Sequence, residues 1–307
     1  MLGVVMGNII LLLVCFAAGI VLRRLGRLPE NSSAALNAFI INIGLPAMAL
    51  GYIHKVEFET SLFYAALMPW VLFAIGAGIL WPVGRLMKWS RRTTGCVIVV
   101  GGLANTSFIG IPMIEAFYGP QWMSVGIVVD LLGSYIVLSF LGITVARLFA
   151  EGPRPTANEL IMRVALFPPF MATVAALVLL PVTYPQWLDA LFERLAATVA
   201  PLALVSVGFQ LRLSDVRGKA GPLAAALSFK LVLGPLIILG LYVGLLDASG
   251  TVVRVTIFEA AMAPMIGAAI VAMDNDLDPP LATLLVGLGV PLSFLTLPVW
   301  YLILVEI

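Results

Sequence analysis

One stretch of this chain reads GLANTSFIGIP, from Gly102 to Pro112, and interrupts an apolar segment with polar side chains and a proline. A second stretch reads EAAMAPMIG, from Glu259 to Gly267, and lies at the matching place in the second half of the chain. Lipid tolerates irregular backbone only where protein or a water-filled cavity satisfies its polar groups. Paired breaks in corresponding spans point to a binding site near the bilayer midplane. The two stretches therefore predict both a membrane fold and the place of a site within it.

The composition favours a bilayer over water as the solvent of this chain. Of its 307 residues, 62% are hydrophobic and 11% are charged, whereas soluble domains carry roughly 25% charged residues. The net charge of +1 gives no indication of a nucleic-acid partner. Ten segments are about long enough to cross ~30 Å of hydrocarbon. They are residues 4–22, 34–53, 61–84, 94–117, 121–147, 163–182, 187–211, 221–246, 251–273 and 280–304. We therefore predict an all-α membrane protein with ten transmembrane helices.

Basic residues gather in alternate connections between these spans. Most of the 17 Lys and Arg residues belong to one set of connections, and the opposite set offers little beyond Lys55. The rich set holds Arg23, Arg24, Arg27, Arg85, Lys88, Arg91, Arg92, Arg147, Arg154, Arg163, Arg212, Arg217 and Lys219. The positive-inside rule makes this set cytoplasmic and predicts that both termini lie outside.

The longest cytoplasmic connection, about residues 149–162, divides the chain into two halves. It contains Gly152-Pro153-Arg154-Pro155, and glycine and proline of this kind mark a linker. Residues 1–150 then hold spans one to five, and residues 160–307 hold spans six to ten. Because five is odd, the second half enters the membrane inverted, which is a recurrent transporter design. We predict a five-plus-five inverted repeat in which the broken spans four and nine cross.

The broken spans carry the candidate substrate site. Asn105, Thr106 and Ser107 can each cap a helix start, because their side chains accept from exposed backbone N–H groups. A half-helix that begins in the membrane presents a partly positive end, which suits an anionic group. Pro264 cannot donate a backbone hydrogen bond and favours the first turn of a helix. A kinked structural helix is the alternative for either break.

Three charged residues lie deep inside predicted spans. Asp130, Lys230 and Glu259 are each about nine or ten residues from a span end, or roughly 13–15 Å deep at ~1.5 Å per residue. An isolated charge there costs at least ~2.5 kcal/mol, so a partner or a water-filled path is expected. Asp130 and Ser134 share a helix face. Asp130 and Ser134 could hold Na⁺, with Asn105 and Glu259 as further ligands. Alternatively, one carboxyl group could carry a proton. A third possibility is a structural ion pair between Lys230 and one of the acids.

Several function classes lack support in the sequence. The single histidine excludes an HExxH metalloprotease, and neither a GxSxG elbow nor a Walker A loop is present. We therefore predict a secondary transporter and not an enzyme, with no organic cofactor. A passive channel or pore, lined by the same breaks, is the alternative.

The chain resembles the auxin efflux carrier family over nearly its whole length. The resemblance rests on the order and spacing of several motifs rather than on any one of them. The motifs are Asn105–Pro112, Asn37 with Leu45-Pro46-Ala47, Pro201–Leu204 with Gly208, Lys230–Pro235, Ala263-Pro264 and Leu277-Asp278-Pro279. Two acids, Asp130 and Glu259, stand where plant-type carriers have Gln, which favours cation coupling. Met265 stands where those carriers have a polar residue.

The resemblance implies a scaffold of spans one, two, six and seven and a mobile transport domain of spans three to five and eight to ten. It also implies an elevator-like movement, a homodimer formed through the scaffold and a location in the bacterial inner membrane. The implied substrates are small organic anions, such as auxins, malonate or related dicarboxylates. They would be held by Asn105, Thr106, Pro264 and Met265, with Pro46 and Ala47 lining the apolar side. The sodium–bile acid symporters have similar crossed helices, so a symporter of that type is a further alternative.

Overall fold

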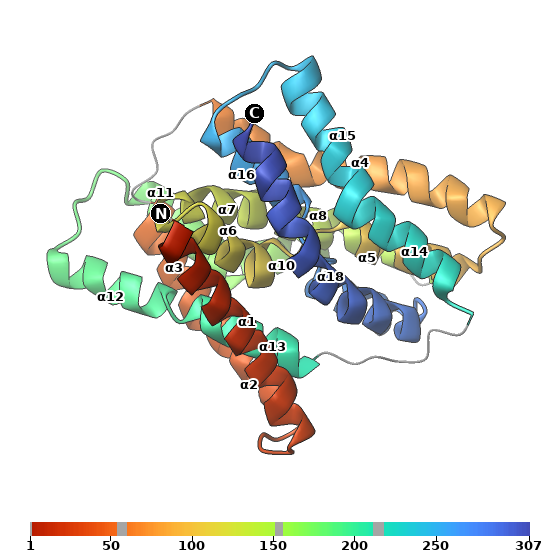
Figure 1. Ribbon diagram of the computed structural model, residues 1–307, viewed down its shortest axis with the longest axis horizontal. Coiled ribbons are helices and arrows are strands. Elements are labelled where there is room, and N and C mark those ends of the chain that lie inside the picture. The colour runs from red at the N-terminus through yellow and green to blue at the C-terminus, as the bar shows by residue number, and fades with distance from the viewer. Residues whose placement is uncertain (1, 54–59, 151–155, 211–217) are drawn as a thin grey trace. The chain divides into compact units, whose positions relative to one another are not determined.

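A computed structural model describes residues 2–53, 60–150, 156–210 and 218–307 (Figure 1). Within these ranges every regular element is a helix, and the only β-type pairing is one isolated bridge. Six of the described helices are long and apolar enough to cross a membrane: Ser32–Ile53, Ser61–Leu86, Pro120–Phe149, Gln186–Gln210, Ala220–Leu245 and Pro279–Val305. The predicted all-α membrane class is confirmed for this part of the chain. Lys55 and the linker residues Gly152–Pro155 lie outside the described residues.

The six helices coincide with predicted spans two, three, five, seven, eight and ten. The first span is α1 (Leu2–Arg24). The prediction of one continuous helix over residues 163–182 is wrong. The structure instead has α10 (Ala157–Ala165) and α11 (Pro168–Val178) there. Pro168 and Pro169 lack a backbone N–H, and the residue before a proline avoids helical angles, so Phe167 is extended at ψ 118°.

The two polar stretches quoted above separate shorter helices. In the first, α5 (Arg91–Gly102) ends, and the helix resumes with η2 (Thr106–Gly110) and α6 (Ile111–Phe117). In the second, α16 (Thr251–Ala260) ends, and α17 (Ile266–Asp274) follows. Each break places three to five non-helical residues between two helix ends, so the backbone groups there need other partners.

The chain folds into two compact units, and neither unit is one continuous half of the sequence. Unit 1 comprises residues 1–58, 107–127 and 163–211, and unit 2 comprises residues 59–106, 128–162 and 212–307. Unit 1 contains α1, α6, α11, α2 (Ser32–Phe39), η1 (Ile40–Gly44), α3 (Leu45–Ile53), η3 (Pro120–Trp122), most of α7 (Met123–Val128), α12 (Gln186–Ala196) and α13 (Val199–Gln210). Unit 2 contains α5, α16, α17, α4 (Ser61–Leu86), η4 (Val129–Ser134), α8 (Tyr135–Val137), η5 (Leu138–Gly142), α9 (Ile143–Phe149), α14 (Ala220–Ser228), η6 (Phe229–Leu233), α15 (Gly234–Leu239), η7 (Gly240–Leu245) and α18 (Pro279–Val305).

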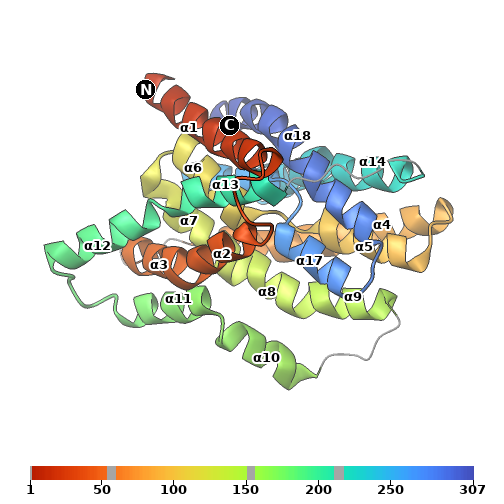
Figure 2. The same ribbon diagram turned by 90° about the horizontal axis from the view of Figure 1, so that it is seen from below.

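In unit 1, α1 lies along α13, and α3 lies beside α11 (Figures 1 and 2). Glycine permits the first of these contacts. A Cβ atom at Gly19 would collide with the carbonyl oxygen of Val205, and one at Gly208 would collide with that of Phe16. The two backbones therefore touch directly, as in small-residue packing between membrane helices.

In unit 2, α5 is surrounded by protein. It packs against α4, α9, α14, α17 and α18, and its residues from Thr94 to Gly102 are buried. A helix whose neighbours are other helices need not present a uniformly apolar surface to lipid. This position explains why a segment that begins Arg91-Arg92-Thr93-Thr94 can enter the membrane region. The end of α5 and the break that follows it therefore lie in the interior of unit 2.

Candidate functional site

The two breaks in unit 2 are joined by their backbones. The Asn105 amide donates to the Ala263 carbonyl at 2.8 Å, and the Met265 amide donates to the Leu103 carbonyl at 3.0 Å. These bonds form an antiparallel bridge between Ala104 and Pro264. Pro264 fits because the bridge uses the Ala263 carbonyl before it and the Met265 amide after it, and needs no N–H from the proline itself. The bridge satisfies two amides and two carbonyls of the breaks without water or lipid.

Packing around the bridge places Pro264 in a fixed position. Gly289 of α18 faces it, and a Cβ at Gly289 would lie 2.5 Å from the Pro264 ring. We expected Pro264 in the first turn of a helix. The structure instead places it two residues before α17, and Met265 occupies the cap position with extended backbone at ψ 126°. The second half-helix therefore begins directly beside the bridge.

The polar side chains of the first break lie next to span five. The Thr106 hydroxyl donates to the Asp130 carboxylate at 2.6 Å, and both residues are buried. Thr106 begins the helix that follows the break, and Asp130 lies in the π-helical turn η4 with Ser134. Asn105, also buried, is the residue directly before this helix start. The structure thus brings Thr106 and Asp130 into contact, with Asn105 next to Thr106 in the chain.

Lys230 has a partner that the sequence did not suggest. Its amine donates to the carbonyl of Ala260 at 2.7 Å, and Ala260 is the last residue of α16. A cation at a helix C-terminus interacts favourably with the unpaired carbonyls and with the helix dipole. In the part of the chain that the structure covers, no direct ion pair joins Lys230 to an acid. Lys230 therefore holds the end of α16 where the second break begins.

Glu259 stands out because its carboxyl group is buried with no hydrogen-bond donor in the part of the chain that the structure describes. Among the described residues, neither carboxyl oxygen has a hydrogen-bond partner, and the side chain is fully buried. Asp130 and Lys230 are near enough to act on it electrostatically. The Ser134 hydroxyl also has no partner among the described residues. Burying an ionised carboxylate without a hydrogen-bond donor is costly, so Glu259 is a candidate for binding a proton or a cation.

The predicted lining residues Pro46 and Ala47 belong to unit 1. They lie in the first turn of α3, where Ala47 is buried and Pro46 is half-buried. Asn105, Thr106, Asp130, Ser134, Lys230, Glu259, Pro264 and Met265 all belong to unit 2. A single compact unit therefore carries eight of the ten predicted site residues.

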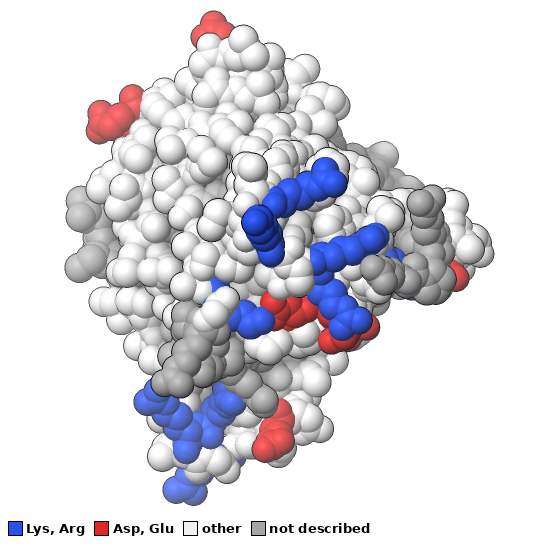
Figure 3. All heavy atoms as spheres, turned by 90° about the vertical axis from the view of Figure 1, so that its right-hand side faces the viewer, with Lys and Arg blue, Asp and Glu red and all other residues white. Residues whose placement is uncertain are grey.

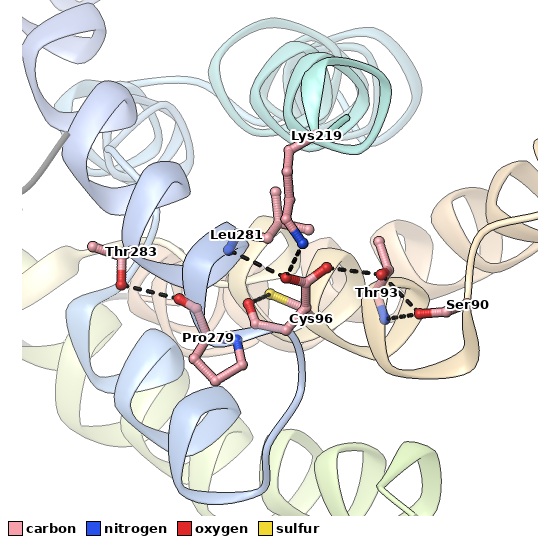
Figure 4. Close-up of polar contacts among 8 residues, drawn as sticks. Ser90, Thr93, Cys96, Lys219, Pro279, Leu281 and Thr283 are labelled. Atoms are coloured by element: carbon pink, nitrogen blue, oxygen red, sulfur yellow. Dashed lines mark hydrogen bonds and ion pairs between the residues drawn. The ribbon is translucent and has the colours of Figure 1, made fainter. Parts of the chain in front are cut away.

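A second polar cluster lies at the starts of three helices in unit 2 (Figure 4). Asp278, in left-handed backbone at φ 53°, caps α18 by accepting from the Leu281 amide at 3.4 Å. Its carboxylate also pairs with Lys219 and accepts from the Thr93 hydroxyl at 2.8 Å. Sequence reasoning noted Asp278 only within a loop motif. An aspartate directly before two prolines is a recognisable helix start, but its contacts with Thr93 and Lys219 come from distant parts of the chain.

Basic side chains gather near this cluster. Figure 3 shows Lys and Arg side chains on the face where α4 ends and where α5 and α14 begin. Arg85 lies in the last turn of α4, Arg91 and Arg92 begin α5, and Lys219 precedes α14. Arg92 pairs with Asp276 at the surface. Arg85, Arg91, Arg92 and Lys219, four of the basic residues that we predict to be cytoplasmic, thus gather at one end of unit 2, whereas Arg154, Arg212 and Arg217 lie outside the described residues.

One protein family and two individual transporters match this chain. A family model described as membrane transport protein matches residues 4–159 and 152–301. The chain is 26% identical over 310 residues to an uncharacterized transporter of Methanothermobacter thermautotrophicus, and the match covers 97% of each chain. It is 25% identical over 215 residues to an uncharacterized transporter of Methanocaldococcus jannaschii, covering 67% of this chain and 68% of the relative. The family model therefore includes both breaks and all the buried polar residues described above.

Proposed function

Because the chain belongs to the membrane transport protein family, the family of the auxin efflux carriers, we propose that it is a secondary active transporter for a small organic anion. It is an integral membrane transporter and not an enzyme. The proposed substrate is a carboxylate, either auxin-like or a dicarboxylate such as malonate.

One observation carries the substrate proposal. The bridge between Ala104 and Pro264 brings two interrupted segments together, with helices resuming at Thr106 and Ile266 directly after it. A helix start offers unpaired amides and a partly positive end, which bind a carboxylate favourably. Asn105 supplies a side-chain hydrogen bond at one start, Thr106 supplies its backbone amide there while its hydroxyl holds Asp130, and Met265 supplies an apolar contact at the other start. In this proposal, spans four and nine are crossed broken helices of a ten-helix inverted repeat.

We propose that Asp130 and Glu259 couple substrate transport to the binding of H⁺ or Na⁺. The Glu259 oxygens, which have no hydrogen-bond partner among the described residues, support this assignment, because a proton or a bound Na⁺ would neutralise the carboxyl group. For Na⁺, the hard oxygen ligands would come from Asp130, Glu259 and Asn105, with Ser134 nearby. Lys230 contributes by binding the carbonyl of Ala260, the residue directly after Glu259, and so holds this end of α16 in place.

The division into two units supports an elevator-type mechanism. Unit 1 contains most of spans one, two, six and seven, the proposed scaffold. Unit 2 contains spans three, eight, nine and ten with parts of four and five, the proposed moving domain. Pro46 and Ala47 would line the scaffold side of the substrate path. The remaining parts of the proposal are a homodimer formed through the scaffold, both termini outside and a bacterial inner-membrane location.

The test is electrogenic uptake into proteoliposomes of the full chain, with a panel of aromatic acids, malonate and other dicarboxylates under an imposed Na⁺ or pH gradient. We expect saturable uptake and counterflow for one class. Flux that neither saturates nor shows counterflow would favour a channel instead. Transport of bile acids alone, with Na⁺, would favour a bile-acid-type symporter.

The residue that tests the site most directly is Asn105. We expect Asn105→Ala to weaken apparent substrate affinity at least about tenfold, because a hydrogen bond to a charged group is worth about 1.5–3 kcal/mol. Asn275→Ala is the matched control, since the Asn275 amide donates to Val271 within its own helix. Unchanged affinity in a folded Asn105→Ala protein would remove Asn105 from the site.

A further inference from the structure

Unit 2 contains a groove that is separate from the candidate transport site. It has a volume of about 700 Å³ and lies between α4, α5 and α9. None of the residues assigned to the transport site lines it. The groove opens at the end of unit 2 where α4 ends and α5 begins, on the basic face shown in Figure 3. Nothing in the proposed transport mechanism uses this cavity.

The mouth of the groove is positively charged. Arg85 lies with its guanidinium 5.1 Å from the centre of the Trp81 ring. Arg91 donates to the Leu148 carbonyl at 2.7 Å and lies 6.0 Å from the Phe149 ring. Among the residues that the structure describes, two arginines and no acidic residue line the groove. The positive charge therefore favours an anionic ligand at the mouth of the groove.

Below the mouth the groove is apolar. Gly78, Ala77 and Ile98 line it, and Gly78 is seven residues before Arg85 on α4, which corresponds to about 10 Å along a helix. A Cβ at Gly78 would meet nothing within 4 Å, so this wall is open. Trp81 lies between the two zones on α4, and Trp89 lies between Arg85 and Arg91 in the chain, and tryptophans of this kind are typical of a membrane–water interface.

We propose that this groove binds an anionic phospholipid from the leaflet on the basic side of the membrane, which the positive-inside rule identifies as the cytoplasmic leaflet. The phosphate lies against Arg85 and Arg91, and one acyl chain enters the apolar groove beside Gly78. Basic pockets between membrane helices on the cytoplasmic side are suited to lipid headgroups. A free phosphate or a soluble carboxylate would satisfy the arginines and leave the apolar part empty. The phospholipid matches both parts of the groove.

Native mass spectrometry of the detergent-purified full chain tests this proposal, with dioleoylphosphatidylglycerol and dioleoylphosphatidylcholine as probes. We expect the wild type to retain phosphatidylglycerol preferentially. Arg85→Gln should weaken that retention about fivefold, the factor expected for one basic residue at an anionic surface. Gly78→Leu should abolish it by filling the groove, and Ala77→Leu is a second filling variant in case Gly78→Leu does not fold.

Two control variants match these changes. Gly240→Leu makes the same substitution at another glycine of unit 2 with nothing within 4 Å, outside the groove. Lys88→Gln removes the same charge from the neighbouring loop, and Lys88 does not line the groove. Both controls should retain phosphatidylglycerol as the wild type does. Equal retention in the folded filling variants and in Gly240→Leu would overturn the proposal. Displacement of the lipid by millimolar inorganic phosphate would also overturn it and assign the arginines to a soluble anion.

Discussion

At the scale of single residues, Glu259 is the most informative side chain in the protein. It is fully buried in the last turn of α16, and within the described residues no donor reaches its oxygens. Lys230, which could have neutralised it directly, instead donates to the Ala260 carbonyl. A carboxyl group in this position is stable only if a proton or a cation accompanies it. This is the physical basis for assigning it to coupling.

Replacing Glu259 by glutamine tests that assignment. Glutamine keeps the size of the side chain and removes the ionisable group, so transport by Glu259→Gln should lose its dependence on the driving Na⁺ or pH gradient. Uptake into proteoliposomes with and without the gradient measures this effect. Glu115→Gln, the same change at a residue of α6 outside the site, should keep the dependence. Full gradient dependence in Glu259→Gln would return Glu259 to a structural role.

At the scale of elements, Asp278 joins the starts of three helices. Its carboxylate contacts Thr93 of α5, Lys219 before α14 and the Leu281 amide of α18. Only 8% of the Asp278 side chain is exposed, whereas 67% of the Asp276 side chain, which pairs with Arg92, is exposed. Exposed ion pairs contribute little to stability, and disrupting a buried pair leaves an uncompensated charge. The two aspartates therefore differ in what they stabilise.

Asparagine substitutions separate these roles. Asn tolerates left-handed backbone and can still cap a helix, and both aspartates have φ 53°. Asp278→Asn should therefore remove mainly the charge interaction with Lys219 and lower stability by about 1–3 kcal/mol. Asp276→Asn should cost about 0–1 kcal/mol. Thermal unfolding of the purified protein, followed by intrinsic fluorescence, compares them. Equal melting temperatures for the two variants would contradict this account of the cluster.

The contact between α1 and α13 depends on the absence of side chains. A methyl group at Gly208 would collide with the Phe16 carbonyl, so Gly208→Ala must push the two helices apart. Overpacking of this kind typically costs about 1–3 kcal/mol. Gly240→Ala introduces the same methyl group into open space and should be nearly neutral. The difference in melting temperature between the two variants measures the effect, and a stable Gly208→Ala protein would show that the contact can relax.

At the scale of the whole molecule, the charge distribution predicts the orientation in the membrane. The loop after α4 belongs to the basic set, and the loop before α16 belongs to the opposite set. In a protein whose Cys15 and Cys96 are replaced by alanine, Ser249→Cys should react with an impermeant maleimide in intact cells. Met87→Cys should react only after permeabilisation. Both positions are exposed in the structure. The reverse pattern would invert the proposed topology.

The candidate site was partly accessible from the sequence. Asn105, Thr106 and Pro264 were identifiable because polar groups and prolines are unusual in apolar spans. Asp130 and Glu259 were identifiable because buried charge is costly. The hydrogen bond from Lys230 to Ala260 was not identifiable, since any acid or carbonyl within reach would satisfy an amine. The break at Phe167 was missed because hydropathy does not weigh the effect of two consecutive prolines on the preceding residue.

Composition, hydropathy and motif order by themselves determined that this is an all-helical membrane transporter with two interrupted spans. Those properties depend on side-chain polarity along the chain, which can be read locally. Only the tertiary structure decided how the interruptions are satisfied, through the backbone bridge at Ala104 and Pro264, and which partners Asp130, Lys230 and Asp278 have. These contacts join residues far apart in sequence, and their geometry is set by helix packing that no local pattern encodes.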